Sequence, residues 1–117
     1  MKTSEILNLT EKEKYEINEE FVNACWDGNL EKVKEILKGY CNPNFKLGSS
    51  IGYASQFGHL EIVKLLLERG ADPSIDNNYA IRNAYYKNNK EIVRLLLQDE
   101  RVRNSLSEEQ IKRYEKL

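Results

Sequence analysis

Apolar and polar positions along this chain recur at an interval of 30 residues. The interval is clearest at three alanines, Ala24, Ala54 and Ala84. Each alanine is followed by a polar break and then by a run whose apolar residues recur at helical spacing. A fixed period of this size is typical of a stacked array, in which a single unit cannot bury its apolar face alone.

Each unit predicts two short helices separated by a stop signal. The stops are residues that tolerate the left-handed conformation, namely Gly28, Gly58 and Asn88, and the residues after them suit helix caps, namely Asn29, His59 and Asn89. With further caps at Asn18, Gly48 and Asn78, the first helices are expected over 19–27, 49–57 and 79–87. The second helices are expected over 30–38, 60–69 and 90–98. None reaches the roughly 12–15 residues at which an isolated helix is marginally stable, so stacking must hold them.

The two ends of the array differ in polarity. Lys32 and Glu35 stand where the middle unit has Ile62 and Leu65, which predicts a water-facing first unit. The third unit keeps its apolar residues and therefore needs a cover. The tail supplies one, because a capping box at 107–110 precedes apolar residues at helical spacing, Ile111, Tyr114 and Leu117. We therefore expect a closing helix over 108–116.

Residues 1–17 lie outside the repeat. The segment Thr10-Glu-Lys-Glu13 matches a capping box and predicts a short helix that carries Tyr15 and Ile17. Together with the upstream apolar residues Ile6, Leu7 and Leu9, this extension either covers the first unit or lies across the groove of the array. The three units then span about 18–47, 48–77 and 78–105, joined by turns rich in Pro, Gly, Asn and Asp.

The middle unit resembles an ankyrin repeat almost letter for letter. The match is Gly58-His-Leu-Glu-Ile-Val-Lys-Leu-Leu-Leu-Glu-Arg-Gly-Ala-Asp-Pro73, and the similarity extends over about 18–104. It implies an all-α solenoid of helix-turn-helix units that binds other proteins. Ankyrin repeats are usually about 33 residues long, and those of this chain are shorter. The segment Asp76-Asn-Asn-Tyr-Ala-Ile-Arg82, followed by Leu95-Leu-Leu-Gln-Asp-Glu-Arg101, resembles the compact ankyrin repeats of amoeba-infecting giant viruses. Both a viral and a non-viral origin of the chain stay open.

One part of the family pattern is absent. The Thr-Pro-Leu-His signature that opens the first helix is replaced by Ser49-Ser-Ile-Gly52 and by Tyr79-Ala-Ile-Arg82. The hydrogen bonds that the signature makes in that turn are therefore expected to be missing or replaced.

The resemblance also implies a binding surface. Residues that follow the alanines on the first helices face the concave side of an ankyrin stack, and in this chain they are Trp26, Asp27, Gln56, Phe57, Tyr86 and Lys87. Trp26 and Tyr86 are expected in one column, with Phe57 between them. Large aromatic residues on such a face are typical of binding hot spots. The alternative, that they pack against turns or terminal segments, stays open.

Composition and candidate chemistry narrow the function further. With a net charge of −1, the chain lacks the excess of positive charge expected of a protein that binds nucleic acid or an anionic membrane. No apolar run approaches the roughly 20 residues of a membrane span. Cys25 and Cys41 are interpreted as free thiols in small core gaps, which is typical of an intracellular, cytoplasmic protein. His59 is the only histidine and is expected to cap a helix. No catalytic, metal or cofactor-binding set can be assembled, so we expect no enzyme and no cofactor.

The sequence thus predicts a monomeric ankyrin solenoid of three repeats with a closing helix. Its expected function is to bind a partner protein, which would be a host protein if the chain is viral. The alternative is a structural subunit that associates with itself through exposed aromatic residues.

Overall fold

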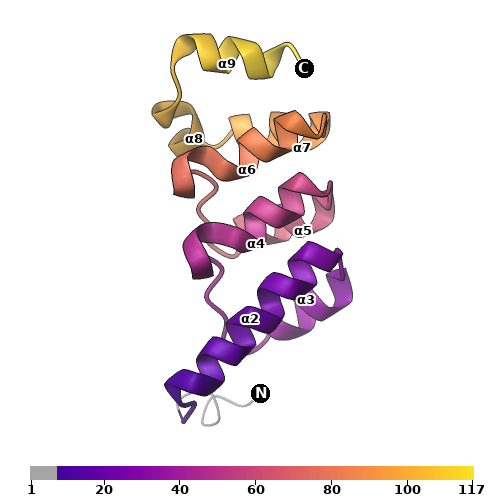
Figure 1. Ribbon diagram of the computed structural model, residues 1–117, viewed down its shortest axis with the longest axis vertical. Helices are drawn as coiled ribbons and strands as arrows, with labels where there is room; N and C mark the ends of the chain where they lie inside the picture. Colours follow the sequence, from indigo (N-terminus) through magenta and orange to yellow (C-terminus); the bar gives the residue numbers. More distant parts are fainter. Residues whose placement is uncertain (1–7) are drawn as a thin grey trace.

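Helices are the only regular elements of residues 8–117, which are the residues that the computed structural model describes. In chain order they are α2 (Glu11–Asp27), α3 (Leu30–Leu37), α4 (Phe45–Gln56), α5 (Leu60–Glu68), α6 (Ile75–Tyr86), α7 (Lys90–Leu97), α8 (Glu100–Ser105) and α9 (Glu108–Glu115). The pairs α2–α3, α4–α5 and α6–α7 stack along the long axis of a body of 48 × 24 × 19 Å (Figure 1). The predicted all-α repeat solenoid with a C-terminal helix is confirmed.

A left-handed residue ends the first helix of each pair, as predicted. The φ angles are +73° at Gly28, +76° at Gly58 and +61° at Asn88. The next backbone N–H then bonds back to the alanine carbonyl that marks the period, at 3.0 Å for Ala24, 2.8 Å for Ala54 and 2.9 Å for Ala84. This turn satisfies a carbonyl that the helix end would leave without a partner. The period of 30 residues is therefore the period of one backbone turn.

The core repeats with the same period. Every first helix buries an apolar residue three positions before its alanine, and every second helix buries a valine: Phe21, Ile51, Ile81, Val33, Val63 and Val93. Leu66 of α5 and Leu96 of α7 are also fully buried. These columns form one continuous core along the stack. Neighbouring repeats therefore supply the burial that one helix pair cannot supply alone.

The first helix is longer than predicted. α2 begins at Glu11 behind the predicted capping box of Thr10 and Glu13, so the extension and the first repeat share one helix. The predicted helix behind Thr10 is therefore present, but the prediction that it is separate from the first helix of the repeat was wrong. Asn18 is not a cap: its side chain is buried and accepts a hydrogen bond from the backbone N–H of Asn42 at 2.8 Å. Ile6 and Leu7, which we expected to cover this repeat or cross the groove, lie outside the described residues.

The turns that open the next two first helices are left-handed. Three successive residues with positive φ, 46–48 and 76–78, precede the right-handed parts of α4 and α6. In the second turn, Arg82 donates to the carbonyl oxygens of Asp76 at 3.1 Å and Asn77 at 2.9 Å. In the first, the Ser49 hydroxyl donates to the carbonyl oxygen of Lys46. Hydrogen bonds from Arg82 and Ser49 thus replace those of the missing signature, which was one of the two expected outcomes.

The C-terminal end carries one helix that we did not predict. α8 begins after Asp99, whose carboxylate caps the helix by accepting from the Arg101 N–H at 2.9 Å, and it buries Val102 completely. The closing helix is confirmed as α9, with its capping box at Ser107. Tyr114 of α9 is buried and packs edge-on against Tyr85 at 5.2 Å.

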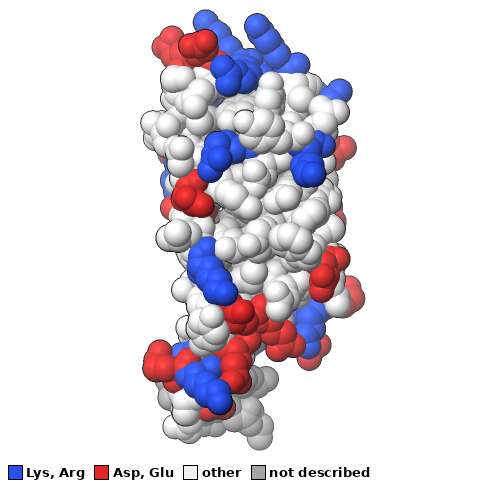
Figure 2. Space-filling model, in the orientation of Figure 1, with Lys and Arg blue, Asp and Glu red and all other residues white. Residues whose placement is uncertain are grey.

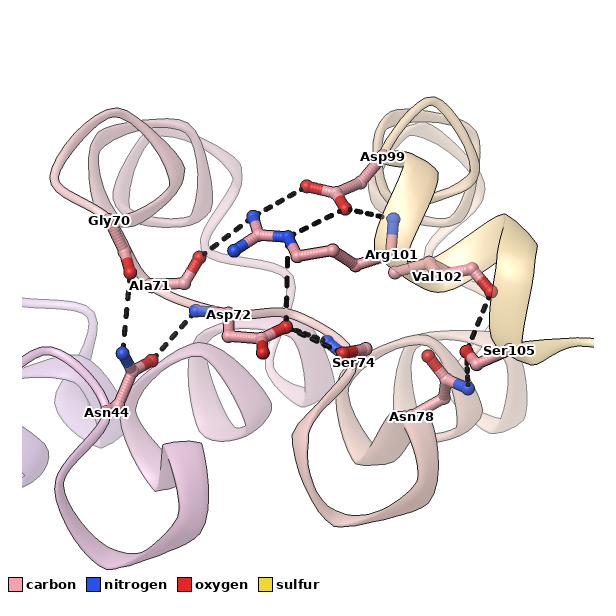
Figure 3. Close-up of polar contacts among 10 residues, drawn as sticks. All are labelled: Asn44, Gly70, Ala71, Asp72, Ser74, Asn78, Asp99, Arg101, Val102 and Ser105. Atoms are coloured by element: carbon pink, nitrogen blue, oxygen red, sulfur yellow. Dashed lines mark hydrogen bonds and ion pairs between the residues drawn. The ribbon is translucent and has the colours of Figure 1, made fainter.

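Polar side chains join the links between repeats along one edge of the stack (Figure 3). Asn44 accepts from the Asp72 N–H at 2.8 Å and donates to the Gly70 carbonyl at 3.4 Å. Arg101 of α8 donates to the Ala71 carbonyl at 3.3 Å, and Asp99 holds its guanidinium at 2.8 Å. Each link is thereby tied to the next one, and α8 closes the series.

Candidate functional site

Four aromatic side chains from three helices meet on the side of the stack formed by the first helices. Trp26 of α2 lies edge-to-face with Tyr53 of α4 at 4.7 Å and with Phe57 at 4.6 Å. Tyr53 in turn lies 6.4 Å from Tyr79 of α6. We call Trp26, Tyr53, Phe57 and Tyr79 the aromatic surface. Edge-to-face pairs of this kind contribute about 0.5–1.5 kcal/mol each beyond their buried area, so the cluster also helps to join the first two repeats.

The aromatic surface is only partly used by the fold. Trp26 keeps 48% of its surface exposed and Phe57 keeps 39%. Tyr53 and Tyr79 are half-buried. Both interpretations of these residues therefore hold in part: one side of each ring packs against its neighbours, and the other side stays available for binding.

Two residues of the following repeats hold this surface in place. His59 Nε2 lies 3.2 Å from the carbonyl oxygen of Trp26, and because a carbonyl only accepts, the imidazole donates. Asn89 Nδ2 donates to the carbonyl oxygens of Ser55 at 2.8 Å and Gln56 at 3.0 Å. Carbonyls at a helix end have no partner within their own helix. Each repeat thus satisfies the helix end that carries the aromatic residues of the repeat before it.

This arrangement corrects the predicted caps. Asn29 caps α3 as expected, because its side chain accepts from the Lys32 N–H at 3.1 Å. His59 and Asn89 occupy the same position in their repeats but make no side-chain cap bond. Their side chains reach across to the preceding repeat instead. Asn29 has no described repeat before it, and its side chain turns to its own helix.

Two glycines leave room for ring side chains of the following repeat. A Cβ on Gly28 would collide with the His59 ring, and a Cβ on Gly52 would collide with the Tyr79 ring. The Tyr79 ring therefore lies directly against the α4 backbone, with the Arg82 guanidinium 5.9 Å from its centre. Gly52 thus lets the Tyr79 ring fill the gap between α4 and α6, and Gly28 lets the His59 ring approach the end of α2.

The predicted site residues fall into two groups. Trp26 and Phe57 are in contact, whereas Tyr86 is 79% exposed and belongs to a second aromatic group with Tyr85, at 6.3 Å, and Tyr114. Asp27 and Lys87 are exposed. Gln56 is half-buried, and its side chain accepts from Asn83 at 3.5 Å.

Tyr53 and Tyr79 belong to the surface but were not predicted. A signal for Tyr53 was present, because it precedes Gln56 by three residues and therefore shares its helix face. Tyr79 had no comparable signal. Its side chain reaches Tyr53 only because Gly52, in another repeat, leaves the space.

The face of the stack in Figure 2 is largely uncharged in its middle, with charged side chains concentrated toward the two ends.

Burial raises the pKa of Cys25 to about 12 and that of Cys41 to about 12, so both thiols stay protonated at neutral pH. The prediction that both are free thiols in core positions is confirmed for Cys25, which is fully buried, and Cys41 is free but only partly buried. Among residues 8–117, no three metal-ligating side chains come together.

The comparison with known families agrees with the repeat pattern and the helix pairs. A family model described as "Ankyrin repeats (3 copies)" matches residues 21–107. No curated protein matched the chain. Over the described residues, no helix is both long and apolar enough to cross a membrane. Repeats of this kind are general protein–protein interaction modules rather than catalytic ones. With three stacked helix pairs and a match over most of its length, the chain belongs to the ankyrin-repeat family.

Proposed function

We propose that this chain binds a partner protein through the aromatic surface, without performing chemistry on it. The observation that carries the proposal is Trp26, which is held edge-on by Tyr53 and Phe57 and still exposes 48% of its surface. A rigid aromatic residue that already has neighbours loses little conformational entropy when a partner covers it. Such residues are the usual anchors of protein interfaces.

The contact area extends from Trp26 to the other residues predicted from the family. Asp27, Gln56, Phe57, Tyr86 and Lys87 all lie at the ends of the first helices or directly after them, and the aromatic pair Tyr53 and Tyr79 joins them. The resemblance of the short repeats to those of giant viruses supports a host protein as the partner class.

The test compares two exposed apolar residues. Trp26→Ala removes the anchor, whereas Leu47→Ala changes a residue that is 70% exposed but lies in the left-handed turn at the start of α4, outside the aromatic surface. Proteins captured from a host lysate are identified by mass spectrometry, produced in pure form and titrated against both variants. Trp26→Ala should weaken binding by more than about 1 kcal/mol, and Leu47→Ala should leave the affinity unchanged.

Two further readouts separate this proposal from self-association. A bound partner should protect Trp26, the only tryptophan, from acrylamide quenching. Light scattering of the pure chain should give a monomer at every concentration. Dimers that are lost in Trp26→Ala would assign the surface to a second copy, and equal binding by both variants would rule out the aromatic surface as the interface.

A further inference from the structure

Charge is distributed unevenly along the stack. Residues 1–40 carry nine acidic and six basic residues, whereas residues 78–117 carry six acidic and nine basic ones. The nearly neutral chain is therefore acidic at one end and basic at the other. Figure 2 shows charged side chains of both signs at each end, with basic ones predominating at the C-terminal end, the top of the view, and acidic ones toward the lower end.

The two ends also differ in how far their charges are paired. Five of the six lysines between residues 8 and 46 form an ion pair with a glutamate, namely Lys12, Lys14, Lys32, Lys34 and Lys46. Among the nine basic residues from 78 onward, only Arg101 is paired with a carboxylate in the part of the chain that the structure describes. Most cations of the C-terminal end are thus not held in an ion pair in the described part of the chain.

Several of these cations surround the second aromatic group. A shallow depression between α6 and α9 is lined by Tyr85, Lys112, Arg113 and Lys116, with Glu109 as its single acidic residue. Burial raises the pKa of Tyr114, which packs against Tyr85, and the nearby charges of Arg82 and Arg113 oppose that rise. We call Arg82, Lys112, Arg113 and Lys116, with the exposed Tyr86 beside them, the basic corner.

We infer that the basic corner binds an acidic segment of the protein partner, with aspartate or glutamate carboxylates as the groups recognised. Arginine pairs with carboxylates in a bidentate geometry, and an uncompensated positive patch steers an acidic segment toward it. The inference rests on the proposed function in one respect, namely that the ligand is part of a protein. It adds a direction, because the acidic segment lies over α6 and α9 while the rest of the partner extends toward Trp26.

An extended nucleic acid fits this charge distribution less well. A polyanion that follows the stack from the basic corner would meet the acidic first repeat, where phosphates are repelled. A short acidic segment that continues into uncharged residues meets cations first and then the uncharged middle of the stack. The charge pattern therefore favours a protein ligand.

The test is a titration of the full chain with a fluorescein-labelled peptide of alternating glutamate and leucine residues, followed by fluorescence anisotropy. Lys112→Glu/Arg113→Glu reverses two exposed charges of the corner. Lys34→Glu/Lys64→Glu gives the same net charge on α3 and α5, and the ion pairs that it removes are exposed ones of small energy. Circular dichroism verifies that both variants fold.

The corner variant should bind the peptide at least about tenfold more weakly than the control variant. A rise in ionic strength from about 0.05 M to about 0.5 M should weaken binding to the unmodified chain. A peptide with glutamine in place of glutamate should not bind. Trp26→Ala should bind the acidic peptide normally. The two proposals can therefore fail separately: a negative peptide titration does not contradict binding by the aromatic surface, and a negative result for Trp26→Ala in partner binding does not contradict the basic corner.

Three results would overturn the inference. The first is equal peptide binding by the corner variant and its control. The second is tighter binding of an oligonucleotide of the same charge, which would make the corner a nucleic-acid site. The third is self-association in light scattering that the corner variant loses, because the acidic first repeat of a second copy would then be the occupant.

Discussion

Gly28 and His59 lie in different repeats, and each limits what the other position accepts. Gly28 has a φ of +73°, and the space where its Cβ would lie is filled by the His59 ring. Gly58 occupies the equivalent position one repeat later with a φ of +76°, but there the nearest atom to a Cβ, Asn89 Oδ1, is 3.4 Å away. The two glycines therefore share a backbone requirement and differ in side-chain packing.

This pair allows a matched stability experiment. Gly58→Ala should cost about 1–2 kcal/mol, the usual cost of a left-handed alanine. Gly28→Ala should cost about 1 kcal/mol more, because the His59 ring must leave the Trp26 carbonyl that it bonds. Urea denaturation measures both losses. In a chain that already carries His59→Ala, Gly28→Ala should cost only about as much as Gly58→Ala, because no ring is left to displace. Equal losses for the two glycines would show that the His59 contact contributes nothing.

At the scale of elements, the last repeat depends on helices that follow the repeat. Leu97 of α7 and Tyr85 of α6 pack into a cluster that Val102 of α8 and Tyr114 of α9 complete. The first repeat needs no such cover on its outer side, where Lys32 pairs with Glu20 at 2.6 Å. α8 and α9 thus end the array on one side, as charged residues end it on the other.

A chain that ends at Ser105 should lose protection from hydrogen exchange across α7. Its core would lose Tyr114, and removal of a buried large aromatic residue costs about 3–5 kcal/mol. Ser107→Ala is the control, because it removes only the cap of α9, which is worth about 0.5–2 kcal/mol. If the truncated chain keeps the protection of the full chain, α9 is only an appendage.

At the scale of the whole molecule, the repeats share one core and should unfold together. Leu66 of the middle repeat is fully buried and belongs to the same cluster as Val33 before it and Val93 after it. In a stacked array of so few units, the contacts between neighbours supply most of the stability. Loss of packing in the middle repeat should therefore be felt at both ends.

Leu66→Ala should lower the free energy of unfolding by about 2–5 kcal/mol. Far-UV circular dichroism reports all helices, and Trp26 fluorescence reports the first repeat. The urea midpoints of the two transitions should fall by the same amount. Leu47→Ala is the control, since a surface change of this kind stays within about 0.5 kcal/mol. A shift in dichroism without a shift in fluorescence would mean that the repeats unfold separately.

Local preferences in the sequence were sufficient to predict the repeat, its turns and most of its helices. Gly28, Gly58 and Asn88 end helices because few other residues adopt positive φ at low cost. The capping boxes at Thr10 and Ser107 act within four residues, and so they too can be read from the chain. The core columns follow because helical spacing alone determines which side of a helix is apolar.

Only the tertiary structure decided the roles of residues whose partners are distant in sequence. Asn18 has its partner 24 residues away, His59 has one 33 residues away and Asn89 has one 34 residues away. A polar residue at a cap position has two possible partners, its own helix or a neighbouring one, and local pattern does not distinguish them. Trp26 joins Phe57, and Tyr85 joins Tyr114, for the same reason: these residues are distant in sequence, and their contacts depend on how the repeats and the closing helix stack.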